Sequence, residues 1–259
     1  MSSERSIFEL PPEPIDPVAM ARRDLKKSLP KRFWKEVDCV TEENGFAIHL
    51  DGKPTRTPAR SHLLLSNRAL AEIVAQEWRE VGEFIDPSSM PLTRLVNSAL
   101  DAVTPRRAEV ADDCARYASS DLLCYRAEEP QRLVERQALH WDPVLSWARA
   151  SYGWRFTLAA GVIHVAQPEE TIAAVRDHLH TIDNPLRLAP LHVVTTITGS
   201  VLLALSLADG AFGPTAIWNA AHVDEDVQME IWGQDSEALE RRKYRERDFR
   251  AAATLLAGL

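Results

Sequence analysis

The sequence contains few cysteines: there are three in 259 residues, and no two of them are spaced as a C-x-x-C pair. Such an odd number of widely spaced cysteines argues against a disulfide framework and against a cysteine-based zinc site. Cys39, Cys114 and Cys124 are therefore predicted to be reduced, buried thiols of a protein from a reducing compartment.

The sequence also lacks an excess of positive charge. Its formal net charge is −8 at pH 7. Binding to nucleic acid requires a basic surface that displaces counterions from the phosphates, so no nucleic-acid partner is expected. A negative net charge instead favours solubility and suits a partner with a basic surface.

No long uninterrupted apolar run is present. The most apolar segment, Leu188–Leu207, contains Pro190, His192 and Gly199, and we predict a buried helix there instead of a membrane span. The first residues show no apolar signal core, and they include Glu4, Glu9, Glu13 and Asp16, which a basic mitochondrial presequence would avoid. The expected location is the cytoplasm of a bacterium.

The usual signatures of catalysis are missing. There is no GxxxxGK[ST], no HExxH, and no GxGxxG after a predicted strand. Ser200 lies in TGSVL, which lacks the second glycine of a nucleophile elbow. His178 and His180 would point to different sides of a helix, roughly 200° apart, and could not bind one metal together. No catalytic residue, metal site or cofactor is predicted, and the protein is not expected to be an enzyme.

The chain divides into three predicted regions. Residues 1–28 are rich in proline and are expected to form an extended arm. Residues 29–91 are predicted to be β-rich, because Asn44-Gly45 separates two strand-like segments and Asp51-Gly52 follows as a second turn. That region includes one helix, which Ser66 can cap. Residues 92–259 are predicted to be helical, so the fold class is α+β with a small antiparallel β-rich unit before a larger helical one.

The predicted helices of the last region follow apolar residues at helical spacing. A small hairpin, Arg155–Leu158 with Val162–Val165, is the one β-like interruption. The main helices are expected at Pro130–His140, Pro143–Ser151, Pro168–Ile182, Leu188–Leu207, Pro214–Ile231 and Ser236–Leu256.

An acidic run, with Asp224, Glu225, Asp226 and then Glu230, lies between two tryptophans in WNAAHVDEDVQMEIWG. On a helix the first three carboxylates fan out over about 200°. Three interpretations stay open. The run can be a solvated or internally neutralised helix face, with Arg241–Arg250 as the source of cations. It can be a docking surface for a basic partner. It can also supply carboxylates to a metal-dependent hydrolase, with a histidine such as His222 as a further ligand.

Seven segments in a fixed order resemble the F1-ATPase assembly chaperones that act on the α subunit of F1, the ATP12-type chaperones. The resemblance extends from about Lys31 to about Ala253. The segments are RFWKEV (Arg32–Val37), LDGKPTRTPAR (Leu50–Arg60), AQEW (Ala75–Trp78), IDPSSMPLTRLVNSALD (Ile85–Asp101), YASSDLLCYRA (Tyr117–Ala127), WDP (Trp141–Pro143) and WNAAHVDEDVQMEIWG (Trp218–Gly233).

The resemblance implies a function without catalysis or a cofactor. Members of this family bind the free α subunit of F1 and release it when the β subunit arrives. Carried onto this sequence, it implies that Glu225, Asp226, Glu230 and Glu240 bind the partner, and that Trp78 serves folding. The free protein is expected to be a monomer. A general holdase, which would protect any exposed apolar segment, stays an alternative.

Overall fold

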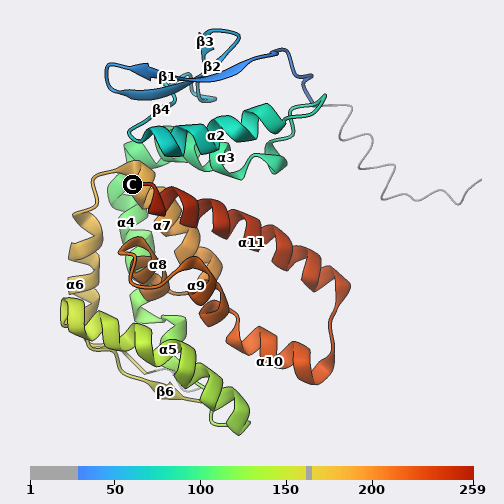
Figure 1. Ribbon diagram of the computed structural model, residues 1–259. Helices are drawn as coiled ribbons and strands as arrows, with labels where there is room; N and C mark the ends of the chain where they lie inside the picture. Colours follow the sequence, from blue (N-terminus) through green and yellow to red (C-terminus); the bar gives the residue numbers. More distant parts are fainter. Residues whose placement is uncertain (1–28, 162–164) are drawn as a thin grey trace, which may run out of the picture.

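The computed structural model describes residues 29–161 and 165–259 (Figure 1). The arm predicted for residues 1–28, and most of the second strand of the predicted hairpin, lie outside the described residues. The first strand of that hairpin is not formed as predicted. Ala159–Ala160 (β6) pairs in parallel with Tyr125–Arg126 (β5), so the partner strand comes from earlier in the chain.

The small sheet is built on a hairpin of β1 (Val37–Glu42) and β2 (Gly45–Leu50), as the Asn-Gly turn predicts. The strands β3 (Lys53–Pro54) and β4 (Leu64–Leu65) both pair antiparallel with β2. Gly45 has a φ of 150°, and a Cβ there would lie 2.6 Å from the carbonyl oxygen of Leu65. A glycine is therefore required where β4 meets the hairpin.

The helix α2 (Arg68–Glu80) packs against this sheet and buries Leu70 and Val74. Asn67, and not the predicted Ser66, caps it, because the Asn67 side chain accepts hydrogen bonds from the amides of Ala69 and Leu70. In Figure 1, α2 and α3 lie between the sheet and the rest of the molecule. They are the layer through which the two parts meet.

The rest of the chain is predominantly helical, and the α+β fold class is confirmed. A π-helical turn, Ala99–Val103, continues the first helix of this part. The helices are α3 (Pro91–Ser98), α4 (Arg107–Arg116), α5 (Gln131–Tyr152), α6 (Glu169–His180), α7 (Pro185–Thr198), α8 (Val201–Ala208), α9 (Pro214–Ala221), α10 (Val223–Trp232) and α11 (Ser236–Ala257).

One predicted break is wrong: α5 continues through Pro143, where two helices were expected. Proline removes one helical hydrogen bond and crowds the preceding turn. Buried side chains on both sides of it offset this cost. Trp141 is fully buried and donates a hydrogen bond from Nε1 to the Ala220 carbonyl at 2.7 Å, and Val144 is also buried.

Two predicted helices are instead each divided in two. The segment Leu188–Leu207 changes direction at Gly199, which has a φ of 70°, and Ser200 then caps α8. The segment Pro214–Ile231 is interrupted at His222, where φ is −116° and ψ is 16°. Neither interruption contains a proline, and the apolar residues keep their helical spacing across both. The sequence pattern therefore predicted continuous helices.

The buried side chains of the sheet and of the helices form one continuous cluster, from Trp34 to Leu256. The boundary predicted after residue 91 stays a prediction. Within the described residues, no helix combines the length and the apolar character that crossing a membrane requires.

Candidate partner-binding surface

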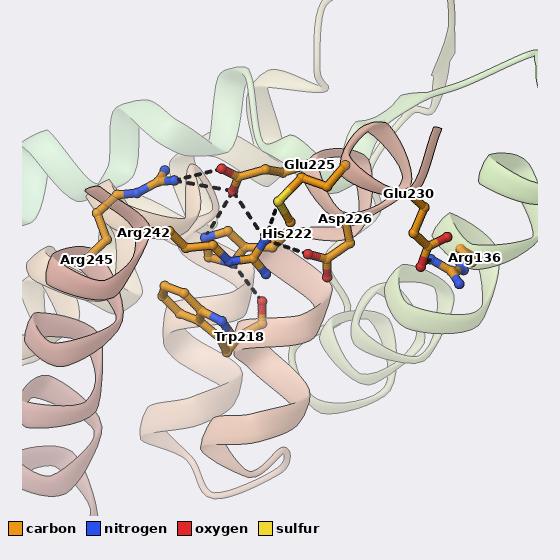
Figure 2. Close-up of polar contacts among 9 residues, drawn as sticks. Arg136, Trp218, His222, Glu225, Asp226, Glu230, Arg242 and Arg245 are labelled. Carbon is orange, nitrogen blue, oxygen red and sulfur yellow. Dashed lines mark hydrogen bonds and ion pairs between the residues drawn. The ribbon is translucent and has the colours of Figure 1, made fainter. Parts of the chain in front are cut away.

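The first three residues of the acidic run, Asp224, Glu225 and Asp226, lie in the first turn of α10, between α5 and the charged half of α11 (Figure 2). Their carboxylates diverge, as the helical spacing predicts. Asp224 accepts a hydrogen bond from Gln137 Nε2 of α5 at 2.8 Å. On the other side, Glu225 and Asp226 pair with arginines of α11. Each carboxylate therefore has its own partner.

Arg242 of α11 is the principal cation on that side. Its Nη1 lies 2.5 Å from Asp226 Oδ1 and 3.9 Å from Glu225 Oε2, and its side chain is only 15% exposed. Its guanidinium also lies 5.9 Å from the centre of the Trp218 ring, within the range of a cation–π contact. Arg245 reaches the two Glu225 oxygens at 3.1 and 3.2 Å. The predicted neutralisation by Arg241–Arg250 is thus realised by two of its arginines.

His222 occupies the junction between α9 and α10. Its Nδ1 donates to the Trp218 carbonyl at 2.8 Å, and the two rings lie 3.8 Å apart between centres. Burial lowers the pKa of His222, and Arg242 and Arg245 lower it further, although the Trp218 carbonyl and Glu225 oppose the shift. Its Nε2 lies 3.8 Å from Glu225, too far for a hydrogen bond. A neutral imidazole is thereby favoured at the junction.

Glu230 is at the other end of α10 and faces α5. It pairs with Arg136 at 2.9 Å and also with Arg132. Arg136 lies 94 residues before Glu230 and Arg132 lies one helical turn earlier still, so the sequence alone did not indicate them. Asp224 contacts Gln137 of α5, whereas Glu230, further along α10, contacts Arg136 and Arg132, which precede Gln137, so α5 and α10 run antiparallel. Glu230 therefore fixes the outer end of α10.

Glu240, on the outer half of α11, is the most accessible of the four predicted residues. Its side chain is 55% exposed, and it pairs with Lys243 one turn later at 3.0 Å. The structure brings Glu225 and Asp226 together, places Glu230 on the opposite flank of α10, and leaves Glu240 on the next helix. Whether these residues bind a partner stays a prediction.

The structure adds an apolar feature that the acidic pattern did not predict. Trp232, the last residue of α10, is 85% exposed, and the adjacent Ile231 is 51% exposed. Trp34, Trp141, Trp154 and Trp218 are buried. Trp232 and Ile231 are named here the α10 tip. Exposed aromatic side chains of this size are uncommon outside interfaces, because tryptophan is among the residue types most enriched there.

The geometry does not favour the hydrolase interpretation. The carboxylates of Asp224, Glu225 and Asp226 point towards different side chains on two different helices. Among the residues that the structure describes, no three His, Cys, Asp or Glu side chains are grouped in a way that could hold a metal ion. The arrangement supports charge pairing and surface recognition.

Comparison with known proteins points to a family of chaperones. The family model for the ATP12 chaperone protein matches residues 31–149. The chain is 47% identical to Atu1473 of Agrobacterium tumefaciens; the match covers 95% of this chain and 92% of that one, with a TM-score of 0.84. It is also similar to Atp12 from Paracoccus denitrificans, at 37% identity over 88% of this chain and 97% of that one, with a TM-score of 0.81.

Proposed function

Because the chain belongs to the ATP12 chaperone family, we propose that it is an assembly chaperone for the F1 sector of ATP synthase. In this proposal it binds the free α subunit, covers the interface that β will occupy, and is displaced when β arrives. An unassembled subunit exposes apolar surface that would otherwise aggregate. The role requires no catalysis, and we propose none.

The observation that carries the proposal is the α10 tip. Trp232 is 85% exposed at the end of a helix whose sides are lined with charge. A large aromatic residue surrounded by polar groups is the usual composition of an interface anchor. We propose that Trp232 and Ile231 contact apolar surface of the free α subunit.

The charged residues of α10 and α11 suit reversible binding. Glu225 and Asp226 are already paired with Arg245 and Arg242, so a basic partner would have to exchange with these arginines. Glu240 is more exposed and can meet a cation with less rearrangement. Electrostatic contacts of this kind raise the association rate more than the affinity, which suits a client that must later be released.

The state of the cysteines supports a proposal for the cellular compartment. The three cysteines are all free, and Cys114 and Cys124 are buried, which is compatible with a reducing compartment such as a bacterial cytoplasm. We further propose that the free chaperone is a monomer and that it joins α in a one-to-one complex. Sedimentation of the purified protein with and without α tests both statements.

Co-purification with unassembled α subunit is the decisive experiment. Trp232→Ala and Glu240→Lys are expected to weaken the complex, the former by more than about tenfold, as for an interface hot spot. Leu139→Ala is the matched control for Trp232, because Leu139 of α5 is also highly exposed, at 70%. Glu170→Lys, on the exposed face of α6, is the control for charge reversal. A wild-type protein that captures no α under any condition would sink the proposal.

The same variants separate this function from that of a general holdase. A holdase would suppress the thermal aggregation of an unrelated protein and would do so at a similar concentration ratio for any client. The proposed chaperone is expected to protect α much better than an unrelated protein. Equal protection of both would favour the holdase.

A further inference from the structure

A cavity of about 670 Å³ lies on the side of α11 where the small sheet unit meets the helical body. Its size falls within the range of about 300–1,000 Å³ that ligand pockets occupy, and junctions between structural units are common places for them. Pro58 and Pro87 line it from the sheet unit. Its helical wall is mainly apolar and includes Leu95, Val103, Val110, Ala189 and Val193.

The cavity wall includes Ala102 and Val103, the last two residues of the π-helical turn Ala99–Val103. Such turns are rare and often mark functional sites. Asp101 within it accepts hydrogen bonds from Thr57 Oγ1 at 2.6 Å and from the Ala59 amide at 2.9 Å. These bonds hold the loop that carries Pro58 against the turn. The cavity is therefore built by two parts of the chain that are bonded to each other.

One polar atom of the wall is left without a partner. Asn97 lines the cavity, and its Oδ1 is buried with no hydrogen-bond donor among the residues that the structure describes. Nearly all buried acceptors in proteins are satisfied, by the protein, by water or by a bound molecule. This oxygen is closed off from solvent, so it reaches a ligand in the cavity only after the Asn97 side chain turns, and it can then accept a hydrogen bond from the backbone N–H of a peptide.

The rim of the cavity carries two arginines, Arg94 and Arg106, and one aspartate, Asp248. Arg94 is answered by Asp248 at 2.7 Å. Arg106 is exposed and donates from Nε to the Ala102 carbonyl at 3.3 Å, but it has no acidic partner in residues 29–161 or 165–259. A ligand with a carboxylate near its apolar part would supply the missing charge.

We infer that this cavity is a second client-binding site, which takes an extended apolar peptide segment carrying an acidic residue. The apolar side chain fills the cavity, the carboxylate pairs with Arg106, and a backbone N–H donates to Asn97 once the Asn97 side chain has turned towards the cavity. In naming the α subunit as the source of this segment, the inference rests on the proposed function. The site is distinct from the α10 tip, since none of its lining residues belongs to α10.

The cavity can be tested without the client. The probe is 8-anilinonaphthalene-1-sulfonate, which combines apolar rings with an anionic group and fluoresces when its rings leave water. Ala102→Phe and, at the exposed rim, Ser98→Phe each fill the cavity and are expected to weaken probe binding about tenfold; Arg106→Glu is expected to weaken it severalfold. Trp232→Ala controls for probe bound at the α10 tip and is expected to leave the cavity-bound component unchanged. Circular dichroism and thermal melting establish that each variant is folded.

The client arm then uses the purified α subunit. Both filled variants are expected to lower its affinity at least fivefold, while Leu139→Ala does not. Unchanged probe binding in folded Ala102→Phe and Ser98→Phe would overturn the cavity as a binding site. Unchanged affinity for α in both variants would overturn it as a client site, even if the probe is lost. If the wild type binds no α at all, the proposed function fails, and the probe alone decides whether the cavity takes an apolar anion.

Discussion

Arg242 of α11 lies 2.5 Å from Asp226 of α10, with a side chain that is 15% exposed, and so joins two helices that are consecutive in the chain. Removing Arg242 leaves Asp226 without its cation and leaves Glu225 paired with Arg245 alone. We expect Arg242→Ala to lower the free energy of unfolding by about 1–3 kcal/mol, as for other partly buried charge pairs. Urea unfolding measures this directly.

The adjacent arginine is the matched control for this substitution. Arg241 is 63% exposed, and among the residues that the structure describes it pairs only with Glu237 on its own helix. Arg241→Ala is expected to cost less than about 0.5 kcal/mol. Equal losses for the two variants would show that the pair between α10 and α11 does not contribute specifically.

Asp121 is fully buried and joins two helical starts. It accepts hydrogen bonds from the amide of Leu123 at 3.1 Å and from that of Leu202, the second residue of α8, at 3.2 Å. In Asp121→Asn, an NH₂ group replaces one of the two carboxylate oxygens. That NH₂ group then faces a backbone N–H, so two hydrogen-bond donors oppose each other. The expected loss at pH 8 is about 2–4 kcal/mol. Asp235→Asn, at the exposed cap of α11, retains an acceptor and should change stability by less than about 0.5 kcal/mol.

Gly45 tests the close approach between β2 and β4. Gly45→Ala introduces a Cβ 2.6 Å from the Leu65 carbonyl oxygen at a φ of 150°. The strand must then move, and we expect a loss of about 1–3 kcal/mol in the free energy of unfolding. Gly82→Ala has no atom within 4 Å of the new Cβ and should be neutral or slightly stabilising. A neutral Gly45→Ala would contradict this account of the turn.

The lowered pKa of His222 predicts that the free energy of unfolding depends on pH. Burial first, and then Arg242 and Arg245, hold its pKa below the ordinary 6.5. Above pH 6.5 neither the folded nor the unfolded chain carries this proton, so its contribution to stability is fully present. As the pH falls below 6.5, the unfolded chain binds a proton that the folded chain resists, and stability is lost.

His222→Asn keeps a donor for the Trp218 carbonyl but does not titrate, so its melting temperature should fall less than that of the wild type between pH 7 and pH 5.5. His178 and His192 also have lowered pKa values, chiefly through burial, and keep part of the slope in both proteins. Burial raises the pKa of Asp121 to about 6, which acts in the opposite direction and is common to both proteins. Parallel curves would show that His222 does not titrate differently in the two states.

Local signals predicted much of the fold. The hairpin of β1 and β2 follows from Asn44-Gly45, because the turn and the alternation of the strands depend on neighbouring residues. The prediction failed where contacts with residues far away in the sequence determine whether a helix continues. Pro143 does not end α5, since Trp141 is anchored to Ala220, about 80 residues later. No property of the segment around Pro143 indicates that contact.

The candidate site shows the same division. The divergence of Asp224, Glu225 and Asp226 follows from helical geometry and is confirmed. The cations of α5 that hold Glu230 come from tertiary packing, and so does the exposure of Trp232. By composition Trp232 is one of seven tryptophans, and only the fold separates it from the buried ones.

The interruption at His222 has a mechanical consequence. The ten residues of α10 form a rigid segment about 15 Å long, with the interruption at His222 at one end and Trp232 at the other. A rotation of about 10° at the interruption would move the tryptophan by about 3 Å. Arginines from α5 hold one flank of this segment and arginines from α11 hold the other. We therefore expect a change of charge on either flank to shift the position of the exposed ring.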